Sequence, residues 1–385
     1  MGTVRTIALL GGGQLGRMFI ENALRYNVSI DVLDPDPHAP CARLADRFVV
    51  GDIRDAETVV RFARDADVVG IEIEHVNVEA MVELKRMGKR VVPDPDVLRI
   101  IKDKGLQKEF YRLHKIPSAP FALIEDLRGI EQHGDLFPAV LKSRSGGYDG
   151  KGVWVLDGND PRSVNAVNGP YVLEKRVGIA KELAVLVVRS TEGTQVTYDP
   201  VEMVFDPRYN LVDHLRAPAR ITSDLSERAK GLAARVAEAF RAPGVYAVEL
   251  FLTEEGELLV NETAPRAHNS GHHTIEACSS SQFDQLLRIY MGWPLGDHTL
   301  RGPAAMINLV GEGGTGIASL VGLDDILHVS GTFAHWYGKR ETRTGRKMGH
   351  ITVTAQDHHG LDQAIAVTKV HCKVVPEKGP IVNEQ

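Results

Sequence analysis

A short apolar run that leads directly into a glycine-rich turn is the feature that most constrains the fold. Residues 6–10 read Thr-Ile-Ala-Leu-Leu, and glycine stands at positions 11, 12, 13 and 16. A helical pattern begins at Gln14 and continues to Tyr26, and a second apolar run, Ser29–Leu33, follows it. A buried strand, a tight turn and a helix in this order are typical of a doubly wound parallel sheet.

The alternation of strands and helices continues to about residue 100. A further strand is predicted over 68–73, a helix over 78–87 and a short strand over 90–92. Residues 1–100 are therefore expected to form one small α/β domain. Glu72 and Glu74 alternate at the end of the strand over 68–73, so they share a face directed toward the ligand crevice of such a sheet. The alternative is a solvated strand end.

The spacing Gly11-x-Gly13-x-x-Gly16, followed by Asp34, has two interpretations. It matches a dinucleotide-binding turn, which would indicate a nicotinamide-dependent oxidoreductase. Alternatively, the glycines only allow close packing of the helix on the strand. The rest of the chain offers no obvious hydride-transfer residues, which favours packing. Binding of a small anion or a substrate stays open, because the free N–H groups at a helix start attract negative charge.

Composition excludes several classes of protein. A length of 385 residues predicts two or three domains, and a net charge of −6 without a long basic run argues against a nucleic-acid partner. Cys41, Cys278 and Cys372 are far apart and odd in number, so no disulfide framework is expected. No apolar stretch reaches membrane length, and no signal sequence is recognisable. These observations favour a soluble cytoplasmic protein without a membrane partner.

The pattern changes after the first domain. Two proline-containing breaks, at 93–95 and 116–120, flank a predicted helix over 97–114. A strand-rich region follows, then a polar helix over 225–242, and residues from 304 to the end read as short strands and turns. The strands are predicted over 139–142, 153–156, 171–174 and 183–189, and a hairpin joins 245–252 to 257–261.

A glycine loop between two of these strands suggests a cover for phosphate groups. Glycines at 146, 147, 150 and 152 would let backbone N–H groups close over phosphate oxygens. Tyr148 and Asp149 stand at its tip, where loop closure could bring them to a reacting centre. An ordinary glycine-rich turn would explain the glycines but not the flanking Lys142 and Lys151.

Two carboxylates on the predicted hairpin suggest a metal site. Glu249 interrupts an otherwise apolar strand, and Glu262 ends the partner strand. In one register they share a face, whereas a slip of one residue would separate them. A buried acid needs a partner or a metal, and paired carboxylates with phosphate oxygens suit Mg²⁺. Exposure of both acids to solvent is the weaker alternative, because Asn261, Arg266 and His268 crowd the same end.

Two further clusters have open interpretations. His268, His272 and His273 could suggest zinc, but their spacing fits no usual ligand pattern and Pro265 indicates a loop. Residues 331–350 contain a basic segment that is either a plain hairpin or a phosphate clamp near the acidic site.

These motifs, in this order, resemble the N5-carboxyaminoimidazole ribonucleotide synthetase family of the ATP-grasp superfamily. The matching segments are Gly11-Gly-Gly-Gln-Leu-Gly-Arg-Met18, Glu72-Ile-Glu-His75, Gly146-Gly-Tyr-Asp-Gly-Lys-Gly152, Asn261-Glu-Thr-Ala-Pro-Arg-Ala-His-Asn-Ser-Gly-His272, His335-Trp-Tyr-Gly-Lys339 and Gly345-Arg-Lys-Met-Gly-His350. The likeness covers nearly the whole chain. The tyrosine-bearing loop and the Arg-x-His-Asn-Ser-Gly-His string are its specific parts.

The resemblance implies three domains and one reaction. A Rossmann-like pre-ATP-grasp domain would cover 1–100, an ATP-grasp domain with a mobile lid at about 116–188 would cover 101–300, and a small β-rich domain would cover 301–385. The implied reaction is ATP-dependent carboxylation of the exocyclic amine of 5-aminoimidazole ribonucleotide by bicarbonate, through carboxyphosphate, in purine biosynthesis. ATP and Mg²⁺ are the implied cofactors, and a homodimer is the implied assembly.

The resemblance also assigns site residues. Lys104, Lys142, Gly147, Gly150, Lys151, Glu174, Lys175, Val177, Glu182 and Asn261 would bind ATP, and Glu249 and Glu262 would hold Mg²⁺. Tyr148, Asp149, Arg266 and His268 would surround the reacting groups. Asn269, Ser270, Lys339 and Arg346 would bind the ribonucleotide, together with Gln14, Leu15 and Glu74, which are assigned by similarity to ribonucleotide formyltransferases.

Two departures from the family pattern and three rival functions remain. Lys104 stands where the family often has arginine, and Val153 where it often has glutamine. The rivals are another ATP-grasp ligase or ribonucleotide formyltransferase, a nicotinamide-dependent oxidoreductase, and a catalytically silent nucleotide-binding regulator.

Overall fold

The computed structural model describes residues 5–146, 152–158, 160, 169–208 and 211–377. Its N-terminal part is a five-stranded parallel sheet in the order β3-β2-β1-β4-β5, which confirms the doubly wound domain. Its elements are β1 (Arg5–Leu10), α1 (Gln14–Ala23), β2 (Val28–Asp34), β3 (Arg47–Val50), α2 (Ala56–Ala63), β4 (Val68–Ile71), α3 (Val78–Arg86) and β5 (Arg90–Val92). Because β4 ends at Ile71 rather than at residue 73, Glu72 and Glu74 lie in the segment after it.

Two helices, rather than the single helix predicted over 97–114, follow this domain. They are α4 (Pro95–Ile101) and α5 (Lys104–Leu113). The Asp103 carboxylate accepts hydrogen bonds from two backbone N–H groups in the first turn of α5, so it caps a new helix. Pro95 was interpreted as part of a break, but it occupies the first turn of α4, where no N–H group is needed.

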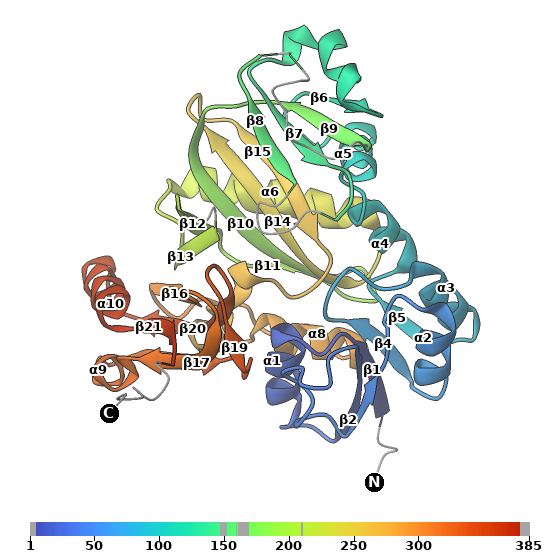
Figure 1. Ribbon diagram of the computed structural model, residues 1–385, viewed down its shortest axis with the longest axis vertical. Coiled ribbons are helices and arrows are strands. Elements are labelled where there is room, and N and C mark those ends of the chain that lie inside the picture. The colour runs from blue at the N-terminus through green and yellow to red at the C-terminus, as the bar shows by residue number, and fades with distance from the viewer. Residues whose placement is uncertain (1–4, 147–151, 159, 161–168, 209–210, 378–385) are drawn as a thin grey trace, which may run out of the picture.

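A small antiparallel sheet lies at the end of the molecule farthest from the N-terminal domain (Figure 1). Its order is β6-β9-β7-β8. The strands are β6 (Phe121–Ile124), β7 (Ala139–Ser143), β8 (Val153–Leu156) and β9 (Tyr171–Lys175), with the 3₁₀ turns η1 (Leu127–Gln132) and η2 (Gly134–Leu136) between β6 and β7. The region expected to be a lid, about 116–188, contains this sheet and also β10 (Ile179–Arg189), which pairs within the large sheet.

A nine-stranded sheet forms the centre of the molecule (Figure 1). Its main path is β15-β14-β10-β12-β13-β16-β20-β18, and β11 pairs with β10. The strands after β10 are β11 (Gln195–Thr197), β12 (Val201–Asp206), β13 (Leu211–Ala217), β14 (Gly244–Thr253), β15 (Leu258–Ala264), β16 (Ala304–Val310), β18 (Thr332–Trp336) and β20 (Lys347–Thr354). Because β13 pairs with β16, this sheet continues across residue 300 into the C-terminal part.

The C-terminal part contains two helices besides its strands. The expectation of only strands and turns after residue 304 is therefore wrong for α9 (Leu323–Leu327) and α10 (His358–His371). The β-branched residues in the second half of α10 suggest a strand, but Asp357 caps the helix and Leu361, Ala364, Ile365 and Thr368 form its buried stripe. A separate small sheet has the order β19-β17-β21, formed by β19 (Glu341–Thr342), β17 (Gly316–Val321) and β21 (Lys373–Pro376).

One apolar core joins the N-terminal domain to the large sheet. The helix α8 (Gln282–Met291) lies beside α1 (Figure 1), and the Phe19 and Tyr290 rings pack edge to face with centroids 5.4 Å apart. The same core includes Val245 of β14 and Tyr337. The other long helix, α6 (Ser223–Phe240), packs on β10 and β14. No helix in the described residues is long and apolar enough to span a membrane.

Candidate active site

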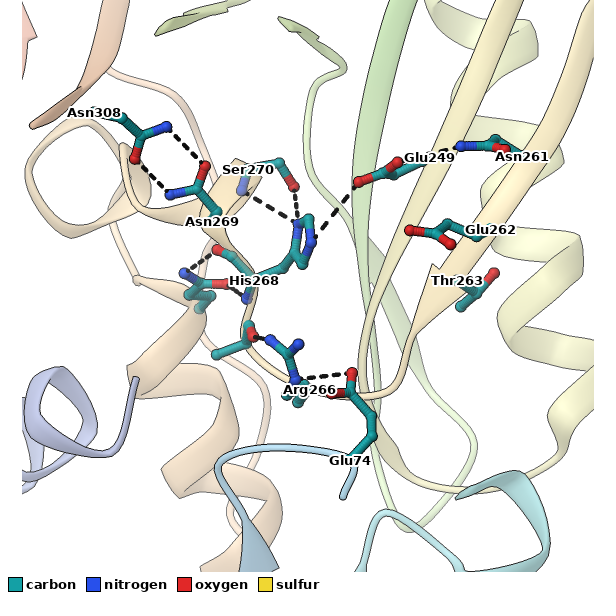
Figure 2. Close-up of polar contacts among 12 residues, drawn as sticks. Glu74, Glu249, Asn261, Glu262, Thr263, Arg266, His268, Asn269, Ser270 and Asn308 are labelled. Carbon is teal, nitrogen blue, oxygen red and sulfur yellow. Dashed lines mark hydrogen bonds and ion pairs between the residues drawn. The ribbon is translucent and has the colours of Figure 1, made fainter. Parts of the chain in front are cut away.

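A bulge in the hairpin of β14 and β15 brings two acids and an amide together. Leu250 pairs with Val260, but Glu249 pairs with Glu262, so Asn261 is an extra residue in β15. The Glu249 and Glu262 side chains therefore lie on one face, which is one of the two registers that the sequence left open. A bulge changes the direction of a strand's side chains, and the Asn261 amide lies 3.4 Å from the Glu249 carboxylate on that face (Figure 2).

The charges on this face fit a bound cation. Burial raises the pKa of Glu249 to about 8, and Glu262 and Glu182 add to the shift. Two carboxylates that face each other on neighbouring strands are stabilised when a divalent cation neutralises their charge, and Mg²⁺ prefers such oxygen ligands. The described residues hold no group of three or more His, Cys, Asp or Glu side chains arranged around a metal.

Lysines approach the acidic face from α5 and β7. The Lys142 ammonium lies 3.0 Å from Asn261 Oδ1 and 3.0 Å from Glu174 Oε1. Lys104 Nζ lies 3.8 Å from Glu262 Oε2. These contacts bring five of the predicted ATP- and metal-binding residues to one place. Lys108 makes a further ion pair with Glu174 at 2.9 Å.

Glu174 and Lys108 form a deeply buried pair whose side chains are each 4% exposed. Burial opposes the charge of Glu174, but Lys142 and Lys108 hold the pKa of its carboxyl below the usual value. Burial also lowers the pKa of Lys108. Sequence reasoning missed Lys108. The signal was available, because Lys104 and Lys108 are four residues apart and share a helix face.

The loop after β15 carries a second charged group toward this face. Arg266 forms a 2.8 Å ion pair with Glu74, which links the loop to the segment after β4. Burial opposes the charge of Glu74, yet Arg266 holds its pKa below the usual value. His268 Nε2 lies 3.8 Å from Glu249 Oε1, and its Nδ1 lies 2.9 Å from Ser270 Oγ. Figure 2 shows the His268 ring directed toward Glu249 and the Arg266 guanidinium directed toward Glu74.

Asn269 joins the loop to the C-terminal part of the sheet. It begins η4 (Asn269–Gly271), which precedes α7 (Thr274–Ala277). Its side-chain amide pairs with the amide of Asn308 on β16 through two hydrogen bonds of 2.9 and 3.1 Å. Asn308 also donates to the carbonyl oxygen of Val212 on β13 at 2.7 Å. Asn308 thus links the loop to two strands of the large sheet, β13 before the loop in the sequence and β16 after it.

The glycine turn of the first domain is filled by the protein's own carboxylates. Asp34 accepts a hydrogen bond from the Gly12 N–H group at 2.6 Å, and Glu72 accepts one from the Leu15 N–H group at 3.1 Å. A Cβ atom at Gly13 would lie 2.5 Å from Glu72 Oε1. Because these acids occupy the start of α1, where a pyrophosphate would otherwise approach, the geometry supports the packing interpretation over the dinucleotide one.

The remaining predicted residues that the structure describes lie on several different elements. Lys339 Nζ contacts Gln14 Oε1 at 2.7 Å and the carbonyl oxygen of Lys347 at 2.6 Å, so it joins the first and last parts of the chain. Arg346 precedes Lys347 and donates to the carbonyl oxygen of Glu341. Glu182 lies on β10, and burial raises its pKa. Lys175 ends β9, with Val177 two residues on. Gly147, Tyr148, Asp149, Gly150 and Lys151 lie outside the described residues.

Three histidine rings stack beside the loop. His350 lies between His335 and His272, with ring centroids 4.4 and 4.8 Å away. His335 Nε2 lies 2.7 Å from Glu276, and the Tyr337 hydroxyl lies 2.9 Å from His350 Nδ1. His335 and His350 belong to the basic segment over 331–350, so part of this segment packs against the loop, with His350 buried and His335 partly exposed.

The buried histidines predict a loss of stability in acid. Burial lowers the pKa of His272 and of His350 well below the usual value, whereas both rings bind protons normally in the unfolded chain. Below about pH 6.5 the unfolded state therefore binds more protons, and the free energy of unfolding falls by up to about 1.4 kcal/mol per pH unit for each ring. We expect His350→Gln to reduce this slope in urea titrations from about pH 7 to about pH 5. An unchanged slope would contradict the assignment.

Comparison with known proteins matches each part of the chain. Three family models match: the ribonucleotide synthetase preATP-grasp domain over residues 4–102, the ATP-grasp domain over 109–283, and the phosphoribosylaminoimidazole carboxylase C-terminal domain over 304–364. The N5-carboxyaminoimidazole ribonucleotide synthase of Bacillus subtilis is 35% identical over 356 residues, which cover 91% of this chain and 91% of that protein.

Solved structures agree along almost the whole chain. The N5-carboxyaminoimidazole ribonucleotide synthetase of Thermotoga maritima is 40% identical, with a TM-score of 0.89 over 97% of this chain and 100% of that one. The synthase of Aspergillus clavatus, in complex with ADP and 5-aminoimidazole ribonucleotide, is 33% identical, with a TM-score of 0.86 over 96% and 99% of the two chains. The chain spans only 66% of the length of a plant chloroplast phosphoribosylaminoimidazole carboxylase that it also matches.

Proposed function

Because this chain belongs to the N5-carboxyaminoimidazole ribonucleotide synthetase family, we propose that it carboxylates 5-aminoimidazole ribonucleotide with bicarbonate and ATP. It is an ATP-grasp ligase of purine biosynthesis. The observation that carries the residue assignments is the meeting of three groups: the acidic face of Glu249 and Glu262, the Arg266–His268 loop, and the lysines of α5 and β7. Cations, paired acids and an imidazole are what phosphoryl transfer to a weak oxygen nucleophile needs.

ATP would lie between the small sheet and the large sheet. Lys104 and Lys142 would meet its phosphates, since both ammonium groups already approach the acidic face. Glu174, Lys175, Val177 and Glu182 would surround the adenosine. The ion pairs of Glu174 with Lys108 and Lys142 fix its carboxylate, so it would act as a rigid part of this wall.

Glu249 and Glu262 would hold Mg²⁺, with Asn261 beside them. The raised pKa of Glu249 supports this assignment, because burial and the neighbouring Glu262 and Glu182 carboxylates disfavour its charge, which a divalent cation would stabilise. When bound, Mg²⁺ would neutralise the phosphate oxygens during transfer. Lys104 and Lys142 would supply further positive charge from the other side.

The reaction has two bond-forming steps. A bicarbonate oxygen attacks the γ-phosphorus, the bond to the ADP oxygen breaks, and carboxyphosphate forms. Carboxyphosphate then breaks down to phosphate and CO₂, and the exocyclic amine forms a C–N bond to that carbon as it loses a proton. Arg266 would hold the anionic intermediate, and His268 is a candidate to take the proton, because its ring lies between Glu249 and Ser270. Tyr148 and Asp149 remain predicted members of this group.

The ribonucleotide would bind where the first and last parts of the chain meet. Lys339 contacts Gln14, and Arg266 contacts Glu74, so groups from three regions converge there. Asn269 and Ser270 would form the near wall, with Leu15 at the start of α1 and Arg346 at the substrate phosphate. The homodimer implied by the family stays a prediction, which analytical ultracentrifugation would measure.

Arg346→Ala is expected to raise the KM for the ribonucleotide by about tenfold or more, with little change in the KM for ATP. The reason is that Arg346 would pair with the substrate phosphate and with no part of ATP. Steady-state kinetics with each substrate varied in turn would measure both constants. Arg343→Ala, in the same turn, is the control. Equal effects on the two KM values would remove Arg346 from the substrate phosphate.

Release of ADP in four reaction mixtures tests the proposed function. Each mixture contains enzyme, Mg²⁺ and ATP, and the ribonucleotide and bicarbonate are added separately or together. Strong stimulation only when both are present supports the proposal. Stimulation by formate in place of bicarbonate would favour the alternative, a ribonucleotide formyltransferase. Turnover indifferent to the ribonucleotide would point to another amine substrate.

A further inference from the structure

Three buried glutamine side chains hold main-chain segments by the same pair of hydrogen bonds. In each, the amide oxygen accepts from a backbone N–H group and the amide nitrogen donates to the carbonyl oxygen of the same residue. Gln107 holds Thr263, Gln282 holds His268 and Gln285 holds Gly296. All three glutamines are at most 4% exposed. His268 is a residue of the candidate site and Thr263 directly follows Glu262, whereas Gly296 lies outside the site.

Gln107 on α5 fixes the end of β15. The Thr263 N–H group donates to its Oε1 at 3.0 Å, and its Nε2 donates to the Thr263 carbonyl oxygen at 3.3 Å. The Tyr111 hydroxyl bridges Gln107 Oε1 and Thr263 Oγ1 at 2.8 and 2.7 Å. Thr263 directly follows Glu262, so this contact sets the backbone from which the Glu262 carboxylate projects.

Gln282 on α8 fixes the loop that follows β15. The His268 N–H group donates to its Oε1 at 2.8 Å, and its Nε2 donates to the His268 carbonyl oxygen at 2.9 Å. The same Nε2 lies 3.1 Å from His272 Nδ1. A Cβ atom at position 271 would lie 2.4 Å from Gln282 Oε1, which explains why glycine stands there.

We propose that Gln107 and Gln282 are positioning residues that fix the two ends of the segment 263–268. Thr263 lies in β15, the edge strand of the large sheet, and His268 lies beyond the end of that strand, so their backbone groups need hydrogen-bonded partners other than a neighbouring strand when buried. The two amides supply them at Thr263 and His268, and the ion pair of Arg266 with Glu74 holds the middle. A site works best when its reacting groups are held before substrate arrives. The proposal rests on the proposed roles of Glu262 and His268.

The test compares Gln107→Met, Gln282→Met and the matched control Gln285→Met. Methionine keeps the length of the side chain but removes the pair of hydrogen bonds to the main chain in each case, so all three variants should lose thermal stability. Partners that orient metal ligands typically change affinity or activity by about 10–100-fold. Gln107→Met is therefore expected to raise by about tenfold the Mg²⁺ concentration needed for half-maximal thermal stabilisation in the presence of ADP.

Gln282→Met should show a different signature. It is expected to lower kcat by about tenfold or more while leaving the dissociation constant for Mg-ADP unchanged, because His268 would act on the substrate rather than on the nucleotide. Gln285→Met should change neither quantity per folded molecule. Equal losses in all three variants, or no loss beyond that of folded protein, would overturn the proposal.

If the methionine variants do not fold, a second set of variants provides the same test. Gln107→Glu and Gln282→Glu keep the volume and one acceptor oxygen but replace the donor that faces the carbonyl group, and the same two signatures are expected. The Mg²⁺ titration needs no substrate. If the wild type fails to carboxylate the ribonucleotide, the proposed function is wrong, yet the Gln107 comparison still decides whether that amide orients Glu262.

Discussion

Glu262→Gln is expected to leave the fold intact and to lower turnover by more than about 100-fold, since even the partners of metal ligands typically change activity by about 10–100-fold. The substitution keeps the shape of the side chain and removes one of the two negative charges that face the proposed Mg²⁺. It also removes a charge that helps to raise the pKa of Glu249, so the folded state should be no less stable.

Single-turnover ADP formation and thermal unfolding would separate these two effects. Glu257→Gln is the matched control, because Glu257 is exposed near the other end of the same hairpin. We expect the control to behave as the wild type. Near-normal activity of Glu262→Gln at saturating Mg²⁺ would remove Glu262 from the metal site.

Arg266→Met is expected to lower both stability and activity, through different causes. The substitution leaves Glu74 without its partner, and removal of one member of a largely buried ion pair typically lowers the free energy of unfolding by about 3 kcal/mol. Both side chains are at most 20% exposed, so solvent screens the pair only partly. Activity should fall by more than about 100-fold, because Arg266 would also hold the anionic intermediate.

A second substitution distinguishes the two causes. In the double variant Glu74→Gln/Arg266→Met, no buried charge is left unpaired, so much of the lost stability should return while activity stays low. Urea unfolding and initial rates would measure this. Arg99→Met is the control, since the surface pair of Arg99 with Glu79 should contribute less than about 1 kcal/mol. Recovery of activity together with stability would make Arg266 a structural residue only.

The parts of the fold that follow a strict period were predictable from the sequence. The strand, turn and helix predicted over residues 6–26 follow from apolar runs and glycines, and the structure confirms them, with the helix ending at Ala23 rather than at Tyr26. The acid pair on the hairpin was predictable only as one of two registers, because the bulge at Asn261 decides it and alternation alone does not show a bulge. The boundary between α4 and α5 depends on one capping aspartate inside a helical pattern.

The partners of the site residues could not be read from the sequence. Lys108 and Gln107 lie far along the chain from the residues they hold, Gln282 lies on a different element from His268, and all three types are common on helix surfaces. Only packing shows that they are buried and which groups they meet. His335 and His350 were assigned to a basic segment for the same reason, since the stacking of their rings and the burial of His350 depend on neighbours that the local sequence does not contain.

The fate of the oxygen atoms of bicarbonate tests the central claim most directly. The enzyme would be supplied with ATP, 5-aminoimidazole ribonucleotide and bicarbonate labelled with heavy oxygen, and the released phosphate analysed by mass spectrometry. Attack of bicarbonate on the γ-phosphorus predicts one labelled oxygen in each phosphate, formed with ADP and only when the ribonucleotide is carboxylated. Phosphate that carries oxygen from water instead, with ADP formation independent of the ribonucleotide, would contradict the account.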